Sequence, residues 1–189
     1  MSTWVCLQLI RTAVSSAPVS LLSSGCLFVL PTCSPPVPPP GLLCLSDGAE
    51  GGESGWSSSI SVHNEILRTA PHLARVLADS WFFDRKGEVP AGKKPFFEIP
   101  VFNYHKGYLS VNYSDNYYHL SQRHAEVPRL GPDHHAAMEL FNSLACSQQL
   151  SLRHILQPGD VQLLSNHTCL HYRGAFRCVR QTRADVQGR

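Results

Sequence analysis

Two histidines and an arginine stand close together near the end of the chain, in the segment Gln157–Arg173. This segment reads as a Pro-Gly-Asp turn, a short apolar strand, an Asn-His pair and then His-Tyr-Arg. Imidazole nitrogens bind divalent transition metals, and a guanidinium pairs with carboxylates. Side chains two or four residues apart in a strand share a face, so His167, His171 and Arg173 are predicted to point the same way. These residue types could bind a metal ion and an anion, and the alternative is that they pack in the core or face solvent.

Two further motifs precede this segment. One is the turn Gly51-Gly52-Glu53-Ser54, which is followed by Ser57-Ser58-Ser59 and Asn64-Glu65. The other is the aromatic stretch Phe96–Tyr104. In their order and separations the three motifs closely resemble the TauD/TfdA (taurine dioxygenase-like) family, and the resemblance spans about residues 41–176.

The resemblance implies an oxidoreductase, an Fe(II)/2-oxoglutarate-dependent dioxygenase. Such enzymes bind iron through two histidines and one carboxylate, and leave the remaining iron positions open to 2-oxoglutarate and oxygen. The family reaction decarboxylates 2-oxoglutarate to succinate and usually hydroxylates a C–H bond of a small-molecule substrate. The implied fold is mixed α and β, with a double-stranded β-helix (jelly-roll) core, helical insertions and an incomplete domain.

The resemblance also implies roles for five residues. By position, His171 matches the distal iron histidine, and the alternative is a strand histidine packed in the core. Ser54 matches a hydroxyl near the 2-oxoglutarate carboxylate, and the alternative is an ordinary turn serine. Arg173 is a candidate for an anionic group or a solvated arginine. Asn166 and His167 are expected to support the site or line its pocket.

The chain departs from the family pattern at two places. The family carries a His-x-Asp or His-x-Glu motif just before the strand matching residues 41–45, but Phe28–Pro35 contains no histidine and no acidic residue. The first histidine of the chain is His63. A later arginine for 2-oxoglutarate is expected near the chain end, where Arg180, Arg183 and Arg189 are weak matches. The second hypothesis is therefore a catalytically inactive truncated form or pseudoenzyme that keeps part of the jelly roll.

Composition limits the other classes of function. The 189 residues carry a net charge of +2 without a basic run, which argues against nucleic-acid binding. The seven cysteines form no Cys-x-x-Cys pair, so a zinc site is not predicted. Residues 1–40 have one charged residue, Arg11, and no apolar run reaches the roughly 18 residues of a membrane span. This segment is predicted to be disordered or a targeting sequence, which places the protein in the cytoplasm or the mitochondrion.

The elements that would position the site alternate irregularly along the chain. Apolar spacing predicts a helix over Ile60–Leu77 with a break at Pro71, and another over Asp133–Cys146 that Asp133 would cap. A strand pair is predicted around the turn His105-Lys106-Gly107. Further short strands are predicted at Leu42–Leu45, Trp81–Phe83, Leu152–Leu156, Val161–Leu164 and Cys169–Tyr172. The predicted domain covers residues 41–176, followed by a basic tail at 177–189. Four other histidines, His119, His124, His134 and His135, are predicted to be surface residues.

Overall fold

The computed structural model describes residues 27–30, 41–44 and 50–177. Most of the predicted N-terminal segment and the tail from residue 178 therefore lie outside the described residues. The described elements follow in this order: β1 (Leu27–Leu30), β2 (Gly41–Cys44), β3 (Glu50–Gly51), β4 (Ser54–Ser58), α1 (Ser59–Thr69), α2 (Pro71–Ala78), β5 (Phe82–Asp84), β6 (Phe96–Glu98), β7 (Phe102–His105), β8 (Tyr108–Val111), α3 (Asp115–Ser121), α4 (Pro132–Ala145), β9 (Ser151–His154), β10 (Val161–Leu163), β11 (Cys169–Arg173) and β12 (Phe176–Arg177).

The helices α1 and α2 form as the sequence predicts, with a break before Pro71. Proline has no backbone N–H and favours the first turn of a helix, and here it opens α2. Ser58 ends β4 and begins α1, because its Oγ accepts a hydrogen bond from the Ser61 N–H at 3.2 Å. One serine thus fixes where the strand turns into the helix.

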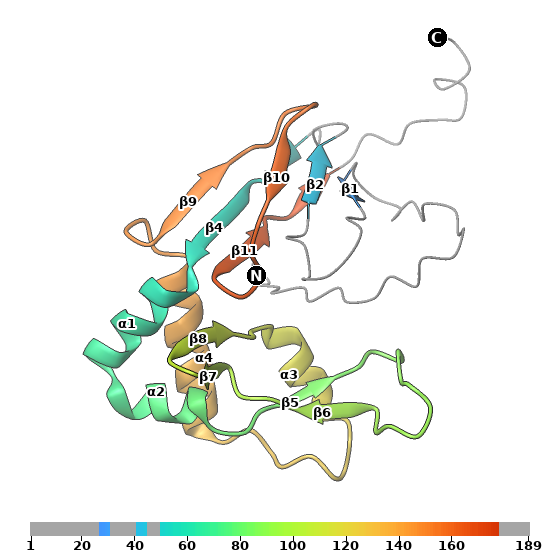
Figure 1. Ribbon diagram of the computed structural model, residues 1–189, viewed down its shortest axis with the longest axis vertical. Helices are drawn as coiled ribbons and strands as arrows, with labels where there is room; N and C mark the ends of the chain where they lie inside the picture. The colour runs from blue at the N-terminus through green and yellow to red at the C-terminus, as the bar shows by residue number, and fades with distance from the viewer. Residues whose placement is uncertain (1–26, 31–40, 45–49, 178–189) are drawn as a thin grey trace.

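The main hydrophobic core lies between α1, α2 and α4 and the β7–β8 hairpin (Figure 1). The rings of Tyr113 and Phe141 stack at 3.9 Å between centroids, and Trp81 donates its indole N–H to the Val76 carbonyl at 2.8 Å. Burial of one large apolar side chain contributes roughly 1.5–3 kcal/mol. The largest fully buried apolar side chains are Trp81, Tyr113, Tyr118, Phe102, Phe141, Ile66, Leu77, Leu170, Val62 and Val101.

The aromatic stretch Phe96–Tyr104 divides into two strands with different partners. β6 pairs with β5, whereas β7 pairs with β8 around the turn at Lys106 and Gly107, both with positive φ. Ile99, Pro100 and Val101 separate the two strands. The sequence pattern also misses the seven-residue helix α3, which has low helix propensity and depends on packing of the fully buried Tyr118.

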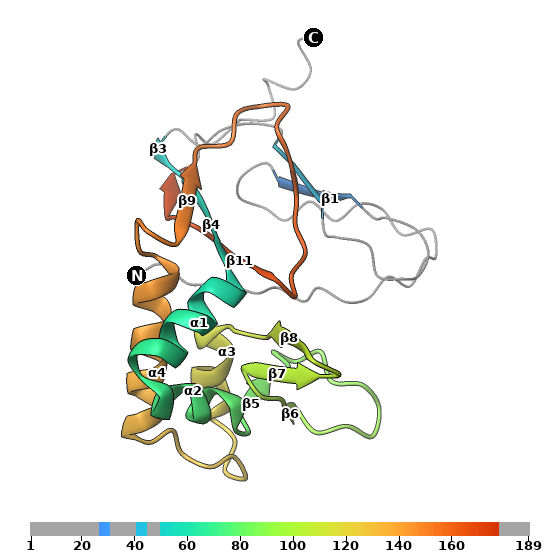
Figure 2. The same cartoon turned by 60° about the vertical axis from the view of Figure 1, so that its left-hand side comes forward.

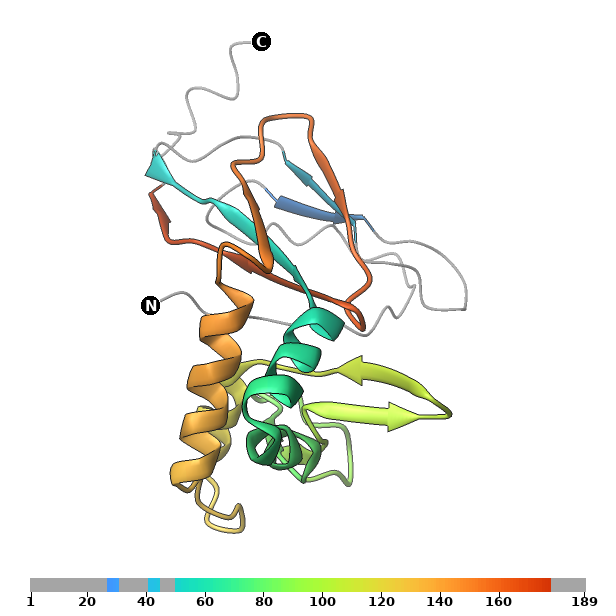
Figure 3. The same ribbon diagram turned by 90° about the vertical axis from the view of Figure 1, so that its left-hand side faces the viewer.

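Two three-stranded antiparallel sheets lie beyond the helices, in the orders β11-β4-β9 and β1-β2-β10 (Figures 2 and 3). The pairs β12-β3, β5-β6 and β7-β8 are two-stranded. The mixed α and β prediction is therefore confirmed. The described strands form small separate sheets, so the jelly roll stays a prediction.

The sheet β11-β4-β9 turns one face to the helices and the other towards β10. On the helix side, Leu170 and Tyr172 join the hydrophobic core, and the Tyr172 ring lies directly over Gly55. A Cβ atom at position 55 would overlap that ring, so any larger residue there would have to displace Tyr172. On the opposite face, Trp56 donates its indole N–H to the Gln162 Oε1 of β10 at 2.9 Å. This hydrogen bond joins the two three-stranded sheets.

No helix in residues 27–30, 41–44 and 50–177 is both long and apolar enough to span a membrane.

Candidate functional site

The register of β4 and β11 brings three of the predicted site residues onto one face. His171 lies opposite Trp56, and Arg173 lies opposite Ser54. Directly opposed residues in an antiparallel pair have Cβ atoms about 4.5–5.5 Å apart. Because 54 and 56, like 171 and 173, differ by two, all four side chains leave the sheet on the face that Trp56 shares with Gln162.

The His171 ring lacks the hydrogen bonds of a satisfied core histidine. Its Nε2 is buried and has no hydrogen-bond partner in the described part of the chain. Burial lowers the pKa of His171, which keeps the imidazole neutral at physiological pH. A neutral imidazole with a free nitrogen lone pair is the form that binds metals.

Ser54 is a strand residue rather than the turn residue of the alternative interpretation. It is the first residue of β4 and is buried, and the turn before it is made by Gly51 and Gly52, both with positive φ. Its register places the hydroxyl beside Arg173. A hydroxyl and a guanidinium on one face offer hydrogen-bond donors to a carboxylate.

Asn166 and His167 lie in a turn before β11, so the prediction that His167 shares a strand face with His171 is wrong. Side chains alternate between faces only within a strand, and β11 begins at Cys169. The His167 carbonyl accepts the Val111 N–H at 3.3 Å, which attaches the turn to β8. Both turn residues border a cavity of 180 Å³, with Ile99, Asn103, Ser110, Val111 and Asn112.

Comparison with known proteins identifies the family. Over residues 40–187 the chain matches the family described as taurine catabolism dioxygenase TauD, TfdA. The chain belongs to this family. It is 32% identical to FR-33289 synthase of Streptomyces rubellomurinus over 141 residues, which cover 71% of this chain and 40% of that protein. It is 30% identical to taurine hydroxylase-like protein SAT17 of Stachybotrys chartarum over 140 residues, which cover 74% of this chain and 35% of that protein. The chain spans less than half the length of these relatives.

Solved structures of TauD/TfdA-type dioxygenases share the fold. Asparagine oxygenase, in complex with Fe(II), 2S,3S-3-hydroxyasparagine and succinate, superposes with a TM-score of 0.51 at 14% identity, over 77% of this chain and 40% of that one. A Burkholderia xenovorans protein described as an alpha-ketoglutarate-dependent taurine dioxygenase gives a TM-score of 0.50 at 14% identity, over 70% of this chain and 46% of that one.

The described residues supply only part of the iron site of a TauD/TfdA dioxygenase. His171 fits as one ligand, because its buried Nε2 is unpartnered. Among residues 27–30, 41–44 and 50–177, however, no group of three His, Cys, Asp or Glu side chains is placed to hold a metal ion. The described donor set therefore does not form a complete facial triad.

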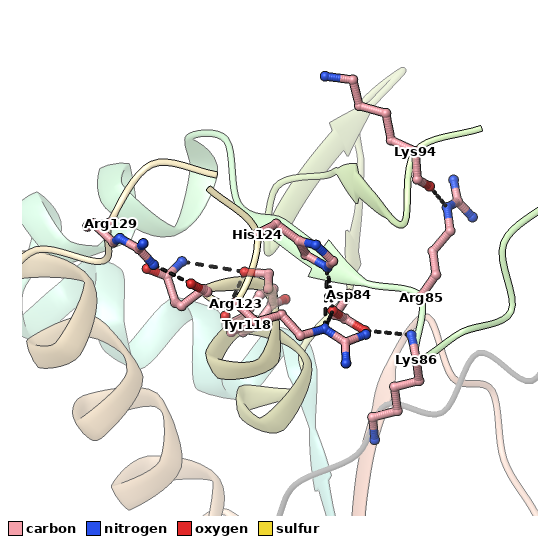
Figure 4. Close-up of polar contacts among 10 residues, drawn as sticks. Asp84, Arg85, Lys86, Lys94, Tyr118, Arg123, His124 and Arg129 are labelled. Atoms are coloured by element: carbon pink, nitrogen blue, oxygen red, sulfur yellow. Dashed lines mark hydrogen bonds and ion pairs between the residues drawn. The ribbon is translucent and has the colours of Figure 1, made fainter. Parts of the chain in front are cut away.

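Sequence reasoning missed a polar cluster around Asp84, at the end of β5 (Figure 4). The fully buried carboxylate accepts hydrogen bonds from Arg123 Nε and Nη2 at 2.9 and 3.0 Å, and from the Lys86 N–H at 2.6 Å. Its Oδ2 also lies 2.8 Å from His124 Nε2, so His124 is a partly buried partner rather than a surface residue. A lone acid followed by a Gly- and Lys-containing loop gave no sequence signal for this long-range pairing.

The remaining histidines divide between packing and surface positions. His63 on α1 is buried, with Nδ1 2.9 Å from Asn64 Oδ1 and Nε2 2.6 Å from the Tyr104 hydroxyl. His134 accepts the Gly131 N–H at 3.2 Å, and Gly131 rather than Asp133 is the N-cap of α4. His119 and His135 are exposed, as predicted.

Proposed function

We propose that this chain contributes to an Fe(II)/2-oxoglutarate-dependent oxygenase that hydroxylates a C–H bond of a small-molecule substrate, with decarboxylation of 2-oxoglutarate to succinate. The observation that carries the proposal is the buried, unpartnered Nε2 of His171, on the sheet face that it shares with Ser54 and Arg173. Membership of the TauD/TfdA family supports the same chemistry, and one relative is named as taurine hydroxylase-like.

Each residue on this face has a distinct proposed role. His171 provides one imidazole to the iron, and burial keeps that ring unprotonated. Ser54 donates its hydroxyl hydrogen to a carboxylate of 2-oxoglutarate, and Arg173 supplies the positive charge beside it. Iron, when bound, supplies the redox chemistry, while the protein orients and shields the reactants.

The surrounding elements complete the proposed site. Trp56 covers the His171 side of the sheet and is fixed by Gln162. Asn166 and His167 line a separate cavity with Ile99 and residues of the β7–β8 region, and they are proposed to support the site from the turn before β11. The sheets β11-β4-β9 and β1-β2-β10, joined by the Trp56–Gln162 hydrogen bond, are proposed as facing parts of a jelly roll within a domain of residues 41–176.

A second candidate function follows from the metal donors. One imidazole alone binds iron weakly, and no cluster of three donors occurs within the described residues. The alternative is a catalytically inactive family member that keeps the 2-oxoglutarate side of the site without holding iron.

One experiment separates the two candidates. The tag-free chain is incubated anaerobically with Fe(II) and 2-oxoglutarate, and bound iron is measured by equilibrium dialysis. Air is then admitted, and succinate is measured by mass spectrometry.

The oxygenase proposal expects bound iron and succinate in the wild type, and loss of both in His171→Ala. His72→Ala, which changes an exposed histidine on α2 away from this sheet, is the matched control and should behave as the wild type. Absence of both iron and succinate in the wild type would reject the oxygenase proposal for this chain.

A further inference from the structure

Two exposed histidines on different helices bring their rings together away from the His171 face. His119 lies in the last turn of α3 and His135 in the first turn of α4. Their ring centroids are 6.0 Å apart and the ring planes are inclined by 22°. The two residues are 16 positions apart in the chain, so the contact is made by folding and not by helical spacing.

The ring nitrogens of this pair are free to bind a ligand. Among the described residues, no hydrogen bond or ion pair engages a ring nitrogen of His119 or His135. Three other histidines differ, because His63, His124 and His134 each use a ring nitrogen in a hydrogen bond. The pair therefore presents unused imidazole donors to solvent.

The separation of the rings suits chelation of one metal ion. A zinc–imidazole bond of about 2.0–2.1 Å places the ring centre about 3.2 Å from the metal. Two such rings bound to one metal at a tetrahedral angle have ring centres about 5 Å apart. The observed 6.0 Å exceeds this by about 1 Å, which a side-chain rotation of two exposed residues can close.

The backbone beneath the two rings is held before any metal arrives. The connection between α3 and α4 is attached to buried Asp84 through Arg123 and His124. Within the connection, the Gln122 side chain bonds the Leu130 N–H at 3.1 Å and the Pro128 carbonyl at 3.2 Å. With the backbone held, only the two side chains must be ordered on binding, which limits the entropy cost.

We propose that His119 and His135 form a two-histidine site for a divalent first-row cation such as Zn²⁺, Ni²⁺ or Cu²⁺. Imidazole prefers these ions over Mg²⁺ or Ca²⁺, which take oxygen ligands. Water completes the coordination, since the described residues place no group of three protein donors together. A bound ion would tie the end of α3 to the start of α4. This site is independent of the proposed oxygenase function.

The test uses tag-free full-length chain carrying His171→Ala, so that binding does not report on that histidine. Isothermal titration with Ni²⁺ and with Zn²⁺ is expected to give one saturable site. His119→Gln and His135→Gln should each weaken it at least about tenfold, and the double variant should be no weaker than either alone. His72→Gln, a change at an exposed histidine on α2, should leave the affinity unchanged.

A second measurement ties binding to the helix pair. Zn²⁺ should raise the melting temperature of the His171→Ala chain, because a ligand that binds the folded state stabilises it. The increase should vanish in His119→Gln, while Mg²⁺ should have no effect. Equal metal affinity in His119→Gln, His135→Gln and their parent would overturn the proposal, as would the lack of any saturable Ni²⁺ or Zn²⁺ binding.

Discussion

The Asp84 cluster and the His171 face differ in whether their buried polar atoms have hydrogen-bond partners. Asp84 is fully buried and is bound by Arg123, His124 and the Lys86 N–H. His171 is half-buried, and its buried Nε2 has no partner among the described residues. Burying a polar group without a partner costs stability. The difference indicates that the Asp84 cluster stabilises the fold, and it supports the proposal that the His171 face binds a ligand.

The largest expected effect comes from removing the charge at the centre of the Asp84 cluster. Asp84→Asn should lower the free energy of unfolding by about 2–3 kcal/mol, because hydrogen bonds to a charged group are lost in a buried place. Urea denaturation measures this loss. Glu126→Gln, which breaks the exposed ion pair with Lys94, is the control and should leave the free energy of unfolding nearly unchanged. Similar small losses for both variants would contradict the stabilising role of the cluster.

The stability that Asp84 contributes should depend on pH. Burial raises the pKa of Asp84, but the Lys86 N–H, His124 and Arg123 outweigh it, so the folded pKa is lowered. A lowered carboxyl pKa adds stability above the unfolded value of about 3.9, and this contribution is lost as pH falls through the folded value. The stability gap between wild type and Asp84→Asn should therefore be full at pH 7 and shrink below about pH 4. A gap that stays constant between pH 7 and pH 3 would show that the charge is not responsible.

A smaller effect is expected at His63, whose two ring nitrogens both have partners. His63→Leu should destabilise the chain by about 1 kcal/mol, the usual net value of a lost hydrogen bond. Thermal unfolding at pH 7.5 measures it. Tyr104→Phe removes the hydroxyl that contacts His63 Nε2. It should lower the free energy of unfolding by at least about half as much as His63→Leu.

The smallest effect on stability is expected at His171. His171→Leu replaces a half-buried ring that carries an unpartnered Nε2 by an apolar side chain, so stability should stay within about 0.5 kcal/mol of wild type or rise slightly. The same urea titration as for Asp84→Asn gives the value. A loss above about 1.5 kcal/mol would mean that His171 is a core residue with native interactions, and would remove the contrast with Asp84.

Local pattern was enough to predict the three longer helices and most strands, but not α3. The spacing of apolar residues gave α1 and α4, and Pro71 marked the break before α2, because both are properties of neighbouring residues. The failure at His167 arose where a turn replaced a strand, so side-chain parity no longer applied.

Pairings between distant segments were harder to predict. Asp84 and Arg123 are 39 residues apart, and Trp56 and Gln162 are 106 apart, so no local period relates them. For the site, the motif around His171 gave the family, but the cross-strand placement of Ser54 beside Arg173 depends on a register that the motif does not specify.

The missing side chain at Gly55 determines which residues meet on the His171 face. The Tyr172 ring occupies the space above this glycine, and a Cβ there would overlap it. If β11 slipped by one residue along β4, Tyr172 would meet Ser54 or Trp56, and His171 would turn to the opposite face of the sheet. Gly55 therefore leaves space for the Tyr172 ring in the observed register, whereas Ser54 and Trp56 carry side chains. Gly55, which has no side chain, thus favours the register that brings His171, Ser54 and Arg173 onto one face.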